Sequence, residues 1–115
     1  MATLNREQVV ANFQQYAGTN TYDLTHETLQ LTKTATMTHG TLLVAAGTEA
    51  INTDLAANVT HVIDDPKVDF AAVGDVVTVS AVADLDAVKF YGSALKLGST
   101  PLSAGELTTF AKKYA

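Results

Sequence analysis

The stretch Thr28–Thr38 constrains the fold most, because threonine or glutamine occupies every second position along it. A period of two over eleven residues is typical of a strand with one buried face, since successive side chains of a strand point to opposite sides. One predicted face carries Leu29, Leu31, Lys33, Ala35 and Met37, and the other carries Thr28, Gln30, Thr32, Thr34, Thr36 and Thr38. The second face is flat, uncharged and rich in hydroxyl groups. It suits contact with another polar surface, and the alternative is a strand face covered only by solvent.

The rest of the chain continues this strand-rich pattern. It contains 17 threonines, whose β-branched side chains favour strands. Apolar or alternating stretches predict further strands at Thr41–Ala46, Asn58–Ile63, Val76–Ala83, Val88–Tyr91 and Ala94–Leu97. Glycine, aspartate and proline between these stretches favour turns. The sequence therefore predicts a mainly β (α+β) fold, with a small sandwich- or barrel-like core of short antiparallel strands.

Helices are predicted at both ends of the chain. Ser103 and Glu106 have the spacing of a capping box, in which each side chain bonds the main-chain N–H of the other residue. The apolar stripe of this C-terminal helix is Leu107, Phe110, Ala111 and Tyr114. A second amphipathic pattern predicts a short helix at Asn5–Tyr16, which must dock on something because an isolated helix of three turns is marginal in water. We expect residues 1–27 to form a helix and arm, and residues 28–115 to form a single β-rich domain.

Charge and composition narrow the classes of function. The net charge is −5, and the seven basic residues form no cluster larger than a pair, which disfavours binding to nucleic acid through its phosphates. The absence of cysteine excludes disulfides and thiolate metal sites. No apolar run approaches the roughly 18 residues that span a membrane, and no secretory signal is visible at the start of the chain. We therefore expect a soluble protein made in the cytoplasm.

Residues that commonly build a catalytic or metal site are scattered along the sequence. The histidines lack metal-binding spacing, the serines lack a nucleophile elbow, and the glycines match no nucleotide-binding loop, so no enzyme activity, cofactor or small-molecule substrate is predicted. One exception stays open, which is a metal or acid–base site made of His61, Asp64 and Asp65. The pair Phe90-Tyr91 lacks the basic groove that would make it a platform for bases, which favours packing in a core or an interface.

Four stretches between Gly40 and the C-terminus follow one another in an order that resembles the head decoration, or capsid cement, proteins of tailed bacteriophages. They are GTLLVAAGTEA, ANVTHVIDDP, VGDVVTVSAVADLDAVKFYGSALKLG and TPLSAGELTTFAKKYA. The resemblance implies a non-catalytic protein that binds the major capsid protein on the outer surface of a matured icosahedral capsid. Such proteins clamp neighbouring capsid subunits and often form trimers. The expected location is the virion, and the open alternative is another head or tail assembly component.

Proteins of this family usually lay an N-terminal arm along the capsid as an added strand, and by position Tyr22–Thr38 would serve. The helix predicted at Asn5–Tyr16 distinguishes this chain from smaller members. The residues expected at a capsid or subunit interface are Tyr22, Leu24, Thr28, Gln30, Thr32, Thr34, Thr36, Phe90 and Tyr91.

Overall fold

The computed structural model describes residues 11–13, 26–85, 88–90 and 92–110 of the chain. The strands in these ranges are β1 (Ala11–Phe13), β2 (His26–Thr32), β3 (Leu42–Val44), β4 (Thr48–Glu49), β5 (His61–Ile63), β6 (Val76–Val82), β7 (Val88–Phe90), β8 (Lys96–Leu97) and β9 (Thr100–Pro101). The helices are α2 (Ala104–Phe110) and the 3-10 helices η2 (Ala45–Gly47), η3 (Asn52–Asp54), η4 (Pro66–Phe70) and η5 (Gly92–Ala94).

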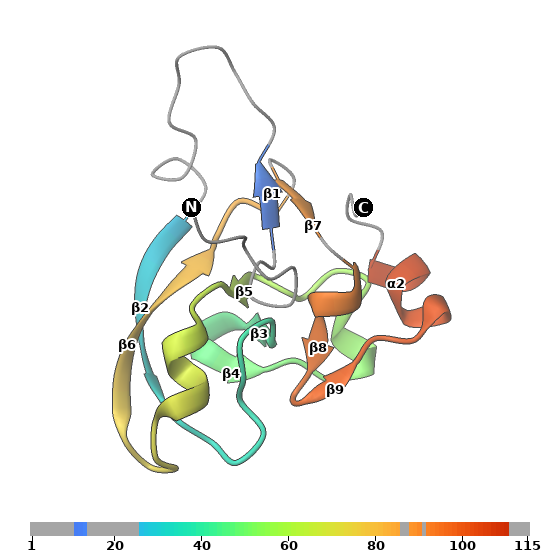
Figure 1. Cartoon of the computed structure of the whole chain (residues 1–115). Coiled ribbons are helices and arrows are strands. Elements are labelled where there is room, and N and C mark those ends of the chain that lie inside the picture. Colours follow the sequence, from blue (N-terminus) through green and yellow to red (C-terminus); the bar gives the residue numbers. More distant parts are fainter. Residues whose placement is uncertain (1–10, 14–25, 86–87, 91, 111–115) are drawn as a thin grey trace, which may run out of the picture.

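Five strands form one antiparallel sheet in the order β2-β6-β5-β3-β4. Two smaller sheets pair β1 with β7 and β8 with β9. Figure 1 shows β2 and β6 as a long curved ribbon along one side of the molecule, with α2, β8 and β9 on the opposite side. The predicted fold class, mainly β with short antiparallel strands and a C-terminal helix, is thereby confirmed.

The first face of the five-stranded sheet carries Leu42, Val62 and Val82, which lie opposite one another on β3, β5 and β6 and are fully buried. Residues paired across strands point to the same side of a sheet. The elements after β6 cover this face with Phe90 and Phe110, whose ring centroids lie 6.0 Å apart. The C-terminal part of the chain therefore covers the first face around Leu42, Val62 and Val82.

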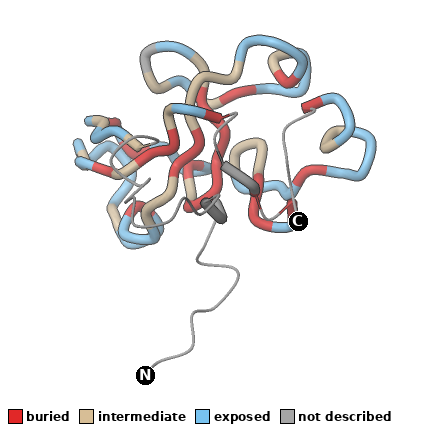
Figure 2. Tube along the Cα trace, turned by 90° about the horizontal axis from the view of Figure 1, so that it is seen from above, coloured by how far each residue is buried: buried red, intermediate tan, exposed pale blue. Residues whose placement is uncertain are grey.

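The second face of the sheet carries Leu43, Ile63 and Val79. The loop after β2 covers it with Met37, and η4 covers it with Val68. Figure 2 shows that most buried segments lie toward the middle of the molecule, with exposed loops around them. The middle of the sheet is thus packed on both sides.

The C-terminal helix begins where the capping box predicts. The main-chain N–H of Ser103 donates to Glu106 Oε1 at 2.9 Å, and the N–H of Glu106 donates to Ser103 Oγ at 3.2 Å. Phe110 of the predicted stripe is buried, whereas Ala111 and Tyr114 lie outside the described residues. The prediction of a capped, amphipathic helix is confirmed over Ala104–Phe110.

The strand predicted at Thr28–Thr38 ends earlier, at Thr32. Lys33 is buried, and its ammonium group donates to the carbonyl oxygens of Met37 and Val68, the second at 2.9 Å. A buried cation needs acceptors of this kind, and the chain turns after Lys33 to supply one of them. The alternating pattern is therefore wrong as a single strand beyond Thr32.

The helix predicted at Asn5–Tyr16 is also wrong where the structure describes it. Ala11–Phe13 is β1, which pairs antiparallel with β7 so that Ala11 lies opposite Phe90. The edge of β7 satisfies main-chain groups that a short helix would leave open at its ends. The remaining residues of that prediction lie outside the described ranges.

The expected boundary between residues 27 and 28 falls inside a strand. β2 begins at His26 and pairs with β6 from its first residue. The segment Tyr22–Thr38 therefore contains a strand of the chain's own sheet, and over His26–Thr32 it is not a detached arm.

Candidate interaction surface

The paired strands β2 and β6 present a polar surface that we call the threonine face. Thr28, Gln30 and Thr32 on β2 are all exposed and lie opposite Ser80, Thr78 and Val76 on β6. Leu29 and Leu31 point to the other side, where they pack with the core that contains Val79. The predicted outward orientation of Thr28, Gln30 and Thr32 is confirmed, while their role in an interface stays a prediction.

The threonine face is also the exposed continuation of the first face of the sheet. Val82 on β6 is buried at one end, whereas Thr78 and Val76 are exposed toward the other end. β2 lies at the edge of the sheet, and within the described ranges β6 is its only strand neighbour. An edge strand keeps main-chain donors and acceptors that another strand can use.

Thr34 and Thr36 do not belong to this face. After the chain turns, the hydroxyl groups of Thr34 and Thr36 both donate to the carboxylate of Glu49, Thr36 at 2.7 Å. Their expected place beside Thr32 on one strand is therefore corrected, because β2 ends before them and β4 supplies a charged acceptor.

Among the aromatic residues of the predicted interface, the structure describes Phe90. Phe90 is fully buried and packs on Phe110, so its ring faces the core and is unavailable to a partner in this conformation. This corrects its place in the interface list, and the cause is that β7 covers the first face of the sheet. Tyr22, Leu24 and Tyr91 lie outside the described residues.

The structure separates the three residues of the possible metal or acid–base site. His61 Nε2 is hydrogen-bonded to Glu27, and its Nδ1 lies 2.9 Å from Thr60 Oγ1. Asp64 accepts from His26 at 2.8 Å. Asp65 caps η4 by accepting from the main-chain N–H of Lys67 at 3.1 Å. Each side chain thus serves a structural contact of its own.

A metal site is not formed by these residues. No group of three or more histidine, aspartate or glutamate side chains within the described ranges is placed to hold a metal ion. The expectation of a metal module around His61, Asp64 and Asp65 therefore finds no geometric basis in the structure.

Two histidine–carboxylate pairs instead bridge β2 to the β5 region across β6, the strand between them. His26 is paired with Asp64 on the first face, and Glu27 is paired with His61 on the second face. His26 has a side chain only 2% exposed, whereas that of Glu27 is 50% exposed. The two pairs hold β2 in place from both sides of the sheet.

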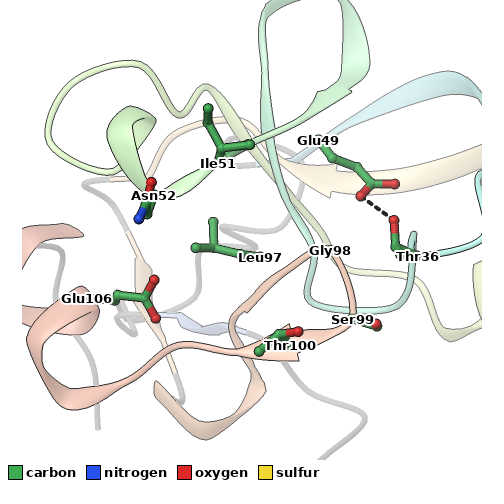
Figure 3. A pocket seen from close by; sticks show the side chains of 10 residues that line it. Thr36, Glu49, Ile51, Asn52, Leu97, Gly98, Ser99, Thr100 and Glu106 are labelled. Carbon is green, nitrogen blue, oxygen red and sulfur yellow. Dashed lines mark hydrogen bonds between the residues drawn. The ribbon is translucent and has the colours of Figure 1, made fainter.

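Residues of β4, η3, β8, β9 and α2 line a groove of about 490 Å³. Figure 3 shows Leu97 between Ile51 on one side and Glu106 on the other. The carboxylates that line the groove are occupied, since Glu49 accepts from threonine hydroxyls and Glu106 accepts from the main chain of Ser103. The lining residues include neither histidine nor lysine.

The comparisons with known proteins add no relative, because no family model, curated protein or solved structure matches the chain. Among the helices in the described ranges, none has the length and apolar character needed to cross a membrane.

Proposed function

We propose that the chain is a structural virion protein that binds the major capsid protein on the outer surface of a phage capsid and bridges neighbouring subunits. The observation that carries the proposal is the threonine face, an exposed, uncharged and hydroxyl-rich surface built on a clamped pair of strands. The order of sequence elements that resembles capsid cement proteins supports the same function.

The physical properties of the threonine face suit this role. Hydroxyl and amide side chains exchange bonds with water for bonds with a partner at a modest net gain for each bond. A weak contact of this kind becomes effective when many copies bind a symmetric shell, or when the protein associates with itself and binds at several points. We propose the outer edge of β2 as a further contact, since strand addition depends little on side-chain identity.

The direct test is binding to expanded, undecorated heads of the phage that encodes the chain. Saturable binding, with increased resistance of the heads to heat, is the expected result. Absence of binding would reject the proposal. Rings or tubes formed by the protein alone would instead identify another head or tail assembly component.

A paired substitution locates the contact. Thr28→Lys with Thr32→Lys places two cations on the threonine face, and we expect binding to weaken by more than about tenfold because burying unpaired charges is costly. The control is Thr53→Lys with Thr108→Lys, which makes the same charge change at exposed threonines elsewhere. Equal binding by the two variants would remove the threonine face from the contact.

A further inference from the structure

Three apolar side chains are exposed near one end of the β2–β6 ribbon. Phe70 is 88% exposed, Val73 66% and Val76 67%, although all three lie within seven residues of the chain. Isolated exposed apolar residues are ordinary, but a group that includes a nearly uncovered phenylalanine marks a contact surface. We call Phe70, Val73 and Val76 the apolar tip.

The backbone forces Val73 outward. The N–H of Asp75 donates to the carbonyl of Ala72 at 3.0 Å, which closes a turn with Val73 and Gly74 at its corner. Gly74 has a φ of +95°, the left-handed conformation that type II turns require at this position. Val73 therefore stands at the apex of the turn.

The apolar tip joins the threonine face. Val76 lies opposite Thr32, so its side chain is on the same side of the ribbon as Thr32 and Gln30. Phe70 ends η4, the helix that covers the second face of the sheet through Val68. The tip thus brings apolar groups to both sides of the ribbon end, which is the shape of a knob and not of a flat patch.

The tip is held rigidly by the residues beneath it. The main chain of Lys33 makes two hydrogen bonds of 2.8 Å to this end of β6, one to Gly74 and one to Asp75. The buried ammonium group of Lys33 also holds the carbonyl of Val68 in η4. Asp69 accepts from the N–H of His39 at 2.7 Å. These bonds hold the main chain of the tip, so binding costs little further backbone entropy.

We infer that the apolar tip is an anchor that inserts into an apolar crevice between subunits of the assembled capsid shell. This inference rests on the proposed function and adds to it the residues that enter the shell. The tip exposes roughly 300–400 Å² of apolar surface, given that a whole aromatic side chain contributes up to ~250 Å². A stable pair of protein chains buries about 800 Å² on each partner, so a second copy docked on the tip alone would hold weakly.

The small apolar area of the tip fits a partner that presents the same crevice many times, which is the assembled shell. Each tip then adds a small contact to the threonine face, and repeated subunits supply the multiplicity. A knob on a rigid end also matches a crevice better than it matches a flat surface.

The test compares Phe70→Ser with Ile51→Ser in the full chain. Ile51 is 62% exposed and lines the groove between β4, η3, β8, β9 and α2. Its substitution therefore removes a similarly exposed apolar side chain that does not belong to the apolar tip. We expect Phe70→Ser to weaken binding to expanded, undecorated heads by about 10- to 100-fold, the scale of a buried aromatic anchor. Ile51→Ser should alter binding less than about twofold, and both variants should keep the thermal midpoint of the wild type.

The second variant is Val73→Ser, which changes the apex without touching Phe70 and is expected to weaken binding by about three- to tenfold. Equal binding of the wild type and the Phe70→Ser protein to the heads would overturn the inference that the tip is an anchor. It would not contradict the proposed function. Heads that bind no wild-type protein would reject both. A wild type whose self-association in solution is lost in Phe70→Ser, with head binding unchanged, would assign the tip to a second copy and overturn the inference.

Discussion

The two ends of β6 differ in how far the sheet around them is covered by other elements. At the Val82 end both sides of the sheet are covered, and Val82, Ala81 and Val79 are buried. At the Val76 end only the second face is packed, and the first face is left to Thr78 and Val76 with their partners on β2. Burial at one end therefore supplies stability, while the other end remains available for contact. Substitutions at the Val82 end should lower the free energy of unfolding, whereas substitutions at the Val76 end should weaken binding.

The largest effect on stability is expected at the covered end. Phe110→Ala empties a site that packs against Phe90 on the first face, and we expect a loss of about 3–5 kcal/mol in the free energy of unfolding. Denaturant unfolding measures it. Phe70→Ala is the matched control, since this phenylalanine is exposed and its loss should cost below about 0.5 kcal/mol. Similar costs at the two sites would break the comparison.

Lys33 links the packed side of the ribbon to the tip. Lys33→Met keeps much of the side-chain volume but removes the donor to the carbonyls of Met37 and Val68. We expect a loss of about 1.5–3 kcal/mol in the free energy of unfolding, because hydrogen bonds to a charged group are involved. An unchanged or increased stability would mean that these carbonyls find other partners.

The two histidine–carboxylate pairs should differ in strength according to their exposure. His26→Ala removes a buried partner of Asp64, and we expect a cost of about 1–3 kcal/mol in unfolding. Glu27→Ala breaks the more exposed pair with His61 and should cost below about 1 kcal/mol. Equal costs would show that the two sides of the sheet do not differ at this position.

The smallest effect on stability is expected on the threonine face. Thr28→Lys with Thr32→Lys should change the free energy of unfolding by less than about 1 kcal/mol, because both side chains are exposed. Thermal unfolding of this variant beside the wild type is the measurement. A large loss of stability would mean that the face is packed and not free.

Local signals in the sequence predicted local structure well. The spacing of Ser103 and Glu106 located the start of α2, because a capping box is complete within four residues. The alternation at Thr28–Thr32 gave the correct inward and outward faces for the same reason. In both cases the information lies inside the element itself.

Features set by distant contacts were missed. The alternating pattern continues past Thr32, and only the burial of Lys33 under η4 ends the strand there. His61 was expected to meet the nearby acidic turn but pairs with Glu27, which is 34 residues away. Phe90 and Phe70 are the same residue type, and the packing of β7 and η4 decides that one is buried and the other exposed. Phe70 lies four residues before Gly74, where the sequence favours a turn, and this position was the available signal for the tip.

The pairing of His26 with Asp64 joins residues 38 positions apart. Among the described strands β2 pairs with β6, which follows Asp64 in the chain. Contacts of such long sequence separation close slowly, since the loop between them must first lose its freedom. We therefore expect the threonine face to assemble late in folding, after the β5–β6 contacts. Pulse-labelled hydrogen exchange would then protect the main-chain N–H of Val82 before that of Leu29. A chain released from synthesis would present no complete threonine face until its core had closed.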